Sequence, residues 1–196
     1  MDARTLAMLR SRLAHYNAFQ SGDTRTDSPF APTYVATTLD GMTYLGLINR
    51  EAKPKRVQVR LADLGLDPRR TYTLFDTATE HYRTLNDKLE LVLPPQSFRL
   101  LLLRTTPGVI WTPSSFTQRA LPVTWDGRPA MRLLVTAYSP EGVPGQMTLA
   151  CSRPSAVQLD GRLLHRGEYV VSSANRTLTL SYSAGYQHLL SVTCEG

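Results

Sequence analysis

The densest apolar segments of the chain are two runs, residues 89–93 and 98–103, which Pro94-Pro95 separates. Neither run is long enough for a core helix, and a proline cannot donate a hydrogen bond to a sheet, so the prolines belong at a bend between strands. In an extended chain every second residue faces the same side, which gives each run one wholly apolar face. The pattern predicts a β-hairpin here, and we expect the segments before it to cover the hairpin.

Polar and apolar residues alternate through most of residues 33–85, as they do in half-buried strands. Asp40-Gly41 divides two alternating segments, and both residues tolerate the positive φ of a two-residue turn. Residues 62–66 predict a short turn or a single helical turn. Together with the hairpin, this region holds about seven strands with a turn signal roughly every ten residues, a pattern typical of an antiparallel β-sandwich.

A second series of alternating segments follows Thr105-Thr106-Pro107-Gly108, a polar and breaker-rich stretch typical of a domain boundary. Asp-Gly recurs twice between these later segments, so both halves use the same turn chemistry. The sequence therefore predicts a mainly β protein with two antiparallel, Ig-like β-sandwich domains in tandem after one N-terminal α-helix. The predicted domains are residues 1–30 (helix and linker), 31–105 (first sandwich) and 106–196 (second sandwich).

Residues 2–19 show a helical pattern. Leu6, Leu9, Leu13 and Tyr16 recur at intervals of three and four, and most charged residues lie elsewhere, so the segment predicts an amphipathic α-helix. Such an apolar stripe needs a partner. The interpretation we favour is that the helix packs on the sandwich that follows it. The alternative is that it is the last helix of a preceding domain.

The charge of the chain adds little to this picture. The net charge is +6 and the isoelectric point is about 9.6, which would permit an anionic partner. The basic residues are scattered, and no aromatic residues alternate with them as in a stacking platform, so we expect no nucleic-acid partner. No apolar run approaches the roughly 20 residues of a membrane span, and the first residues lack a signal peptide's apolar core. We therefore expect no membrane partner and a cytoplasmic location for the chain as written.

Candidate catalytic groups do not converge in the sequence. His15, His81, His165 and His188 are isolated from one another, and no two of them have the spacing of a metal site. We expect a surface role or a hydrogen-bonded core role for each of them. The sequence contains neither a glycine-rich phosphate loop nor a nucleophile elbow. The prediction is that the chain binds no cofactor and no metal.

Four carboxylates raise the question of glycoside hydrolysis, which needs two acidic side chains across a sugar site. They are Asp76, Glu80, Asp87 and Glu90. Asp76 and Glu80 bracket a Thr-Ala-Thr turn, and Glu90 falls on the exposed phase of a predicted strand. We interpret these residues as solvated charges at sheet edges.

The two cysteines, Cys151 and Cys194, each lie on the apolar phase of a predicted strand, so both side chains point into one core. Two buried thiols are the interpretation we favour, because the sequence has no export signal. A disulfide between them is the alternative. Neither cysteine has a second cysteine or a histidine at ligand spacing, which argues against a metal site.

The second half also contains aromatic residues that a sugar could contact, because the apolar face of a pyranose packs on an aromatic ring. The candidates for carbohydrate binding are Trp111, Trp125 and Tyr138. Packing within a core is the alternative, and it is the more common role of such residues.

Four strings of the first half stand out when they are taken in order. They are residues 44–50 (YLGLINR), 57–66 (VQVRLADLGL), 72–76 (YTLFD) and 93–101 (LPPQSFRLL). In this order they resemble the C-terminal β-sandwich of melibiase-type glycoside hydrolases, the α-galactosidase-like enzymes. The resemblance covers residues 1 to about 105, and its first 30 residues look like the exit from such an enzyme's barrel. The segment from Val109 onward is similar to an extra Ig-like β-domain of some bacterial members.

The resemblance implies a function but no active site. In that family the catalytic nucleophile and acid are aspartates of a TIM barrel, and this chain has no such barrel, so no catalytic residue is carried over. We therefore expect a non-catalytic accessory region of a glycoside hydrolase, with a catalytic barrel as its partner. A free-standing carbohydrate-binding module is the alternative. An enzyme in its own right is the hypothesis we favour least.

Overall fold

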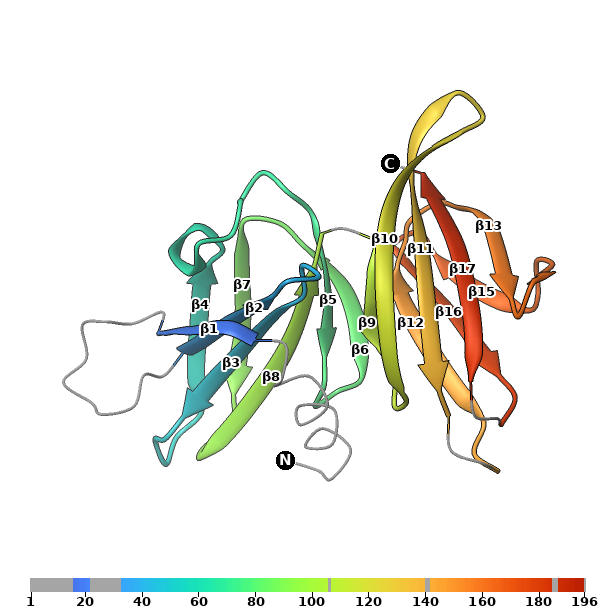
Figure 1. Ribbon diagram of the computed structural model, residues 1–196. Helices are drawn as coiled ribbons and strands as arrows, with labels where there is room; N and C mark the ends of the chain where they lie inside the picture. The colour runs from blue at the N-terminus through green and yellow to red at the C-terminus, as the bar shows by residue number, and fades with distance from the viewer. Residues whose placement is uncertain (1–15, 22–32, 106, 140–141, 185–186, 196) are drawn as a thin grey trace. The chain divides into compact units, whose positions relative to one another are not determined.

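The protein is described from a computed structural model, which covers residues 16–21, 33–105, 107–139, 142–184 and 187–195. The chain divides into two compact units, Met1–Thr105 (unit 1) and Thr106–Gly196 (unit 2), which Figure 1 shows as separate groups of strands. The division falls inside the Thr-Thr-Pro-Gly stretch that the sequence marks as a boundary.

Unit 1 has two antiparallel sheets in its described part. The larger sheet has six strands in the order β1-β2-β3-β8-β5-β6, and the smaller one pairs β4 with β7. The strands are β1 (Tyr16–Ser21), β2 (Thr33–Thr38), β3 (Thr43–Asn49), β4 (Lys55–Arg60), β5 (Tyr72–Asp76), β6 (His81–Leu85), β7 (Lys88–Leu93) and β8 (Ser97–Arg104).

The core of unit 1 lies between these two sheets. Leu89 and Leu93 of β7 enter it from the smaller sheet, and Leu45, Leu101 and Leu103 enter it from the larger one. All five side chains are buried. Because full burial of a leucine contributes about 2 kcal/mol, contact between the two leucine-rich strands is a main source of stability for this unit.

The predicted hairpin at Pro94-Pro95 is wrong. β7 and β8 follow each other in sequence, but β7 pairs with β4, whereas β8 pairs with β3 and β5. The proline corner therefore carries the chain from one sheet to the other. The physical reason is that two apolar runs bury more surface when they face each other across a core than when they lie side by side.

Asn49, at the end of β3, secures this corner. Its buried side-chain amide donates hydrogen bonds to the carbonyl oxygens of Lys53 (2.9 Å), Leu93 (3.3 Å) and Pro94 (2.7 Å). Its Oδ1 accepts a hydrogen bond from the backbone amide of Glu51 (3.0 Å). A buried carbonyl that loses its donor costs about 1–3 kcal/mol. One side chain thus ties the loop after β3 to the corner between the sheets.

An ion pair between a buried arginine and a half-buried aspartate lies at the other end of the large sheet. Arg104, the last residue of β8, is buried, and its guanidinium lies 3.4 Å from the carboxylate of Asp40 in the turn between β2 and β3. The guanidinium also donates to the backbone carbonyl of Asp40. Burial of an arginine is tolerated only when its charge is paired and its donors are satisfied, and the Asp40-Gly41 turn provides both.

The predicted helix at residues 2–19 falls mostly on residues 1–15, which lie outside the described residues. Residues 16–21 are described, and they form β1, which pairs with β2 at the edge of the large sheet. The helix prediction is therefore wrong for residues 16–19. The edge of the large sheet offers hydrogen-bond partners for the backbone amides and carbonyls of these residues. The spacing of apolar residues along the sequence does not reveal that such an edge is near.

One short helix occurs in the part of the chain that the structure describes. It is a 3₁₀ turn at Ala62–Leu64, where the sequence predicts a short turn or a single helical turn. Gly65 ends it with φ 73°, a left-handed conformation that glycine adopts without steric cost. The turn places Leu64 in the core of unit 1.

The described residues of unit 2 also form two antiparallel sheets. One has the order β10-β11-β17-β13-β14 and the other has the order β15-β16-β12-β9. The strands are β9 (Gly108–Trp111), β10 (Ser115–Trp125), β11 (Arg128–Tyr138), β12 (Gly145–Ala150), β13 (Pro154–Leu159), β14 (Arg162–Leu163), β15 (Tyr169–Ser172), β16 (Thr177–Tyr182) and β17 (His188–Glu195).

A disulfide joins the two sheets of unit 2. Cys151 directly follows β12 in the four-stranded sheet, and Cys194 lies in β17 of the five-stranded sheet. Their Cα atoms are 5.7 Å apart, and both residues belong to the core between the sheets. The structure therefore has the disulfide that was the alternative, and not the two buried thiols that we favoured.

The described residues confirm a mainly β, antiparallel fold with four sheets, which is consistent with two β-sandwiches. The finer assignment of an Ig-like topology stays a prediction.

Candidate functional site

The hairpin of β10 and β11 carries two of the three aromatic residues predicted to bind carbohydrate. Its strands pair over their whole length, from Ser115 opposite Tyr138 to Trp125 opposite Arg128. Asp126 and Gly127 close it with φ angles of 46° and 73°. The sequence predicts a turn over residues 126–129, and in the structure the turn is shorter, because Arg128 and Pro129 already belong to β11. Each of the two aromatic residues is thus held at one end of a long, regular hairpin.

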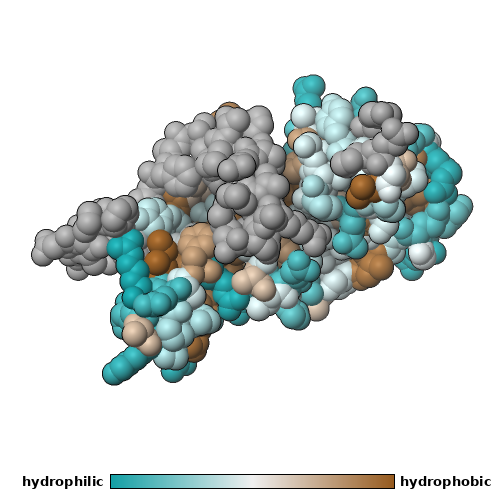
Figure 2. Space-filling model, turned by 90° about the horizontal axis from the view of Figure 1, so that it is seen from below, coloured by the Kyte–Doolittle hydropathy of each residue, from teal (hydrophilic) through white to brown (hydrophobic). Residues whose placement is uncertain are grey.

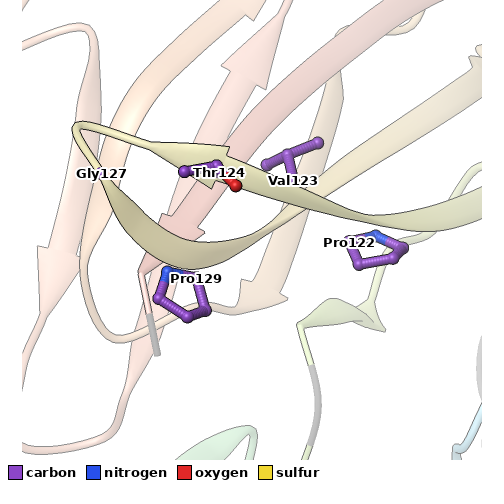
Figure 3. A pocket seen from close by; sticks show the side chains of 5 residues that line it. All are labelled: Pro122, Val123, Thr124, Gly127 and Pro129. Carbon is purple, nitrogen blue, oxygen red and sulfur yellow. The ribbon is translucent and has the colours of Figure 1, made fainter.

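A shallow hollow lies next to the tip of this hairpin (Figure 3). Its volume is about 420 Å³ and it is open to solvent. Its lining consists of Pro122, Val123, Thr124, Gly127 and Pro129. The lining contains no titratable group, so the hollow has no acid, base or metal ligand with which to catalyse a reaction. It offers two proline rings, a methyl-bearing surface and one hydroxyl group, which suits contact with the less polar face of a small molecule.

The three predicted aromatic residues do not form one platform. Trp111 lies in β9 and is only 7% exposed, so its ring has no open face for a sugar. Trp125 is partly exposed and Tyr138 is 44% exposed. Arg128, the register partner of Trp125, lies ten residues from Tyr138 along β11, so about 33 Å separates the two ends. Of the three, Trp125 alone combines a partly exposed ring with a neighbouring hollow.

Two of the four carboxylates considered for glycoside hydrolysis, Asp76 and Glu90, lie next to cationic side chains. Asp76 lies 3.5 Å from the guanidinium of Arg99, and Glu90 lies 2.9 Å from the ammonium of Lys88. Lys88, and after it Arg56, lowers the pKa of Glu90 below its ordinary value. A carboxyl group with a lowered pKa, such as that of Glu90, is a poor general acid, because that role needs a raised pKa.

The described residues also contain no group of three or more His, Cys, Asp or Glu side chains that could hold a metal ion. Their helices include none with the length and hydropathy of a membrane span. In the view of Figure 2, hydrophobic residues of the described surface form separate patches among hydrophilic ones.

Sequence reasoning missed one polar contact, between the buried His188 and the exposed Asp160. The Nδ1 of His188 lies 2.8 Å from Oδ2 of Asp160, and its Nε2 lies 2.9 Å from the carbonyl oxygen of Ser183. The other carboxylate oxygen of Asp160 accepts a hydrogen bond from the amide of Leu189 (2.8 Å). Partial burial raises the pKa of the Asp160 carboxyl, but the hydrogen bonds from His188 and Leu189 outweigh it and lower the pKa below its ordinary value.

Both ring nitrogens of His188 are engaged, and the ring is almost fully buried against Tyr182, with ring centroids 5.0 Å apart. It has no nitrogen left for a metal or for proton exchange with a substrate. The pair fastens the turn between β13 and β14 to the start of β17. The Asp160-Gly161 dipeptide signals the turn in the sequence, but nothing local connects it with a histidine 28 residues further on.

No protein-family model matches the sequence, and a comparison with curated proteins finds no match. The solved structures that are similar to this chain include the following two, each of which it matches in part. One is the isomalto-dextranase of Arthrobacter globiformis T6 in complex with panose, at 12% identity and a TM-score of 0.37, over 93% of this chain and 37% of that one. The other is a β-porphyranase of glycoside hydrolase family 86 from Bacteroides plebeius, at 12% identity and a TM-score of 0.19, over 86% of this chain and 37% of that one.

The similarity is therefore to parts of glycoside hydrolases, and this chain spans 37% of the length of each. Neither is described as an α-galactosidase. At TM-scores this low, the two alignments carry no argument about the function of this chain.

Proposed function

We propose that this chain is a non-catalytic accessory β-sandwich region of a glycoside hydrolase of the α-galactosidase type, and that it packs on and supports a catalytic barrel. The observation that carries the proposal is where the resembling residues lie. Asn49 ties a loop to the corner between the sheets, Gly65 ends a one-turn helix and Pro94 forms the corner itself. These are structural joints of one sandwich and not parts of a reaction site, so the resemblance is to a supporting module.

The chemistry of the described residues supports the same proposal. Asp76, Glu90 and Asp160 are each engaged by a cation or a histidine, and both nitrogens of His188 are occupied. The hollow beside the hairpin tip has no titratable lining. These properties support a role in binding or in supporting a partner, because the parts of a reaction site, a nucleophile and an acid side by side, are not found together among the described residues named above.

Co-expression tests the proposed partner. If the DNA upstream of the chain encodes a β/α barrel, the barrel and this chain are produced together and purified through a tag on the barrel. We expect the chain to co-elute in equal amount and to raise the thermal stability of the barrel. An unrelated barrel serves as the control and should not retain the chain. Separate elution of the two would contradict the proposal.

Activity of the chain alone provides a second test. We expect no hydrolysis of a nitrophenyl α-galactoside by the purified chain. Hydrolysis that disappears on Asp76→Asn would make the chain an enzyme and would overturn the proposal.

A second candidate function is carbohydrate binding at the tip of the β10–β11 hairpin. It is favoured by one observation, namely that Trp125 is partly exposed and that the lining of the open hollow includes Thr124, directly before it, and Gly127, two residues after it. Aromatic rings and nearby hydroxyl groups are the usual partners of a sugar face. This function could accompany the first, since a supporting module can also extend a sugar cleft.

Titration with galactosides and a glycan array tests the second function. If sugars bind at the hairpin tip, Trp125→Ala abolishes binding and Thr124→Ala weakens it. Tyr138→Ala is the matched control, because it removes an exposed aromatic ring at the far end of the same hairpin. Flat titrations with the unaltered chain, or equal losses for Trp125→Ala and Tyr138→Ala, would exclude a binding site at the tip.

A further inference from the structure

The five-stranded sheet of unit 2 has an outer face, which points away from the core of that unit. Leu133 and Val135 of β11 belong to the core. Because side chains alternate along a strand, Arg132 and Leu134 point outward. The register partner of Leu134 in the neighbouring strand β10 (Figure 1) is Arg119, which therefore points to the same side. Two arginines, both exposed, thus share this face.

Arg119 and Arg132 are diagonal neighbours across β10 and β11. Arg119 pairs with Leu134 and Leu121 pairs with Arg132, so one diagonal step separates the two arginines. Diagonal Cα atoms of an antiparallel pair are about 7–8 Å apart, which is within reach of long side chains. Two guanidinium groups at such positions repel each other, and an anion bound between them removes the repulsion.

Neither arginine is neutralised by the described part of the chain. No carboxylate there lies within 4.0 Å of either guanidinium group. Elsewhere in unit 2, by contrast, the guanidinium of Arg162 lies 2.7 Å from the carboxylate of Glu168. The strands of the five-stranded sheet contain one carboxylate, Glu195, whose register partner Ala130 lies two residues before Arg132. The outer face therefore carries an excess of positive charge.

Hydroxyl groups surround the two arginines on this face. Thr117 and Thr136 are register partners in the next outward row, and Ser191 of β17 pairs with Leu134. The guanidinium fork binds a carboxylate or a similar oxyanion through two parallel hydrogen bonds, and a hydroxyl group both donates to and accepts from another hydroxyl. From Thr136 to Arg132 these groups extend about 14 Å along β11. An extended ligand with acidic groups and hydroxyls fits this spacing better than a single small anion.

Two other classes of extended anion fit the face less well. A peptide binds a sheet through main-chain hydrogen bonds at an edge, whereas a sheet face offers side chains only. A single-stranded nucleic acid needs aromatic rings on which successive bases stack. The outward positions from Thr117 to Val123 in β10, and their register partners in β11, include no aromatic residue. The chemistry of the face is therefore that of a site for an acidic polysaccharide.

We propose that the outer face of the five-stranded sheet binds an acidic polysaccharide, with Arg119 and Arg132 each holding a carboxylate or sulfate group of the polymer. This surface is distinct from the hollow at the hairpin tip, whose lining includes neither arginine. The inference goes beyond the proposed function and does not rest on it, because a supporting role needs no anion on this face.

Calorimetric titration of the full chain tests the site. The probes are polygalacturonate, which carries carboxylates, a sulfated galactan, and uncharged galactan as the control polymer. We expect the chain to bind at least one of the two acidic polymers, and the binding to weaken as salt is added, because salt screens exposed charges. The acidic polymer that binds more tightly identifies the group that the arginines hold.

Substitutions locate the binding on this face. Arg119→Ala and Arg132→Ala should each weaken binding to the acidic polymer about tenfold, because each removes a charge-assisted pair of hydrogen bonds. Arg132→Lys keeps the charge but loses the fork, so its loss should be smaller. Glu195→Gln should strengthen binding about twofold, because it removes the carboxylate of the sheet. Arg83→Ala, which removes an exposed arginine of unit 1, is the matched control and should change nothing.

Three outcomes would overturn the inference. One is the absence of binding to both acidic polymers. Another is an equal loss for Arg83→Ala and for the two face variants, which would mean that the net charge of the chain attracts the polymer. The third is equally tight binding of poly-glutamate with the same sensitivity to Arg119→Ala, which would make the site one for acidic protein segments. None of these outcomes alters co-elution with a barrel, so the proposed function stands or falls separately.

Discussion

In units 1 and 2, two antiparallel sheets are held together by different kinds of bond. In unit 2 the disulfide between Cys151 and Cys194 connects the sheets covalently. Unit 1 has no cysteine, and the side chain of Asn49 instead ties its large sheet to the corner that leads from the small one. The comparison teaches that redox conditions act on one unit, while the other depends on hydrogen bonds and burial.

The largest expected effect is the loss of the disulfide. Cys151→Ala with Cys194→Ala removes a cross-link between residues 43 positions apart, which in the chain-entropy model stabilises unit 2 by about 4 kcal/mol. Denaturant unfolding followed by tryptophan emission reports on unit 2, because both tryptophans lie there. We expect its midpoint to fall, and a reductant to have the same effect on the unaltered chain.

Unit 1 is the internal control for that experiment. Followed by NMR signals of residues in unit 1, its unfolding should keep the same midpoint in the double variant and in the presence of the reductant. If the unfolding midpoints of both units fell together, the two units would unfold as one body, and the disulfide would not stabilise unit 2 alone.

The second largest effect is the loss of the hydrogen bonds that Asn49 makes in unit 1. Asn49→Ala leaves the carbonyls of Lys53, Leu93 and Pro94 without their donor, and we expect a loss of about 2 kcal/mol in the unfolding free energy of unit 1. Asn49→Asp should be worse at neutral pH, because a carboxylate would face three carbonyl oxygens. Gln58→Ala is the control, since its amide bonds Glu90 on the exposed surface and should matter by less than about 0.5 kcal/mol.

A pair of glycines extends the comparison to packing. In unit 2 a Cβ on Gly145 would lie 1.9 Å from the ring of Tyr182, which is buried, so Gly145→Ala forces the ring to move at a cost of about 1–3 kcal/mol. In unit 1 a Cβ on Gly46 would lie 3.1 Å from the ring of Phe98, which is partly exposed and free to shift. Gly46→Ala should therefore be nearly neutral. Equal midpoint shifts for the two variants would contradict this account.

The smallest expected effect is electrostatic, and it concerns the pKa values of two carboxylates, Glu168 in unit 2 and Glu90 in unit 1. The hydrogen bonds from Arg162, and then from the amide of His165, lower the pKa of Glu168 to about 2. Because the folded pKa is the lower one, this contribution to stability is present above pH 4.5 and is lost as the pH falls through about 2. Carbon-13 titration by NMR should show Glu168 protonating below Glu90, and Arg162→Ala should bring Glu168 back toward its ordinary value. An unchanged Glu168 titration in that variant would refute the assignment.

Sequence reasoning succeeded where the signal is local. The Asp126-Gly127 turn and the one-turn helix that Gly65 ends both depend on residues next to one another, and both occur at the predicted places, although the turn is shorter than predicted. It failed where a distant partner decides the structure. The corner at Pro94-Pro95 looks like a hairpin until β3, β4 and β5 are known to pair with its two arms.

The candidate site shows the same limit. The sequence identifies Trp111, Trp125 and Tyr138 as aromatic residues that a sugar could contact, but the distances between them and the burial of Trp111 depend on the sheets. The contact of His188 with Asp160 links residues that have no sequence relation. The cysteines are intermediate, because strand phase predicts that they share a core while their oxidation state requires the geometry.

The corner between the sheets also has a consequence for how unit 1 assembles. Because β7 and β8 do not pair with each other, neither leucine run finds its partner in the adjacent segment of chain. Each run stays accessible until β3, β4 and β5 have reached it, and unpaired apolar strands of this kind are prone to associate between molecules. Slow or crowded refolding should therefore lead to aggregates that begin at residues 89–103.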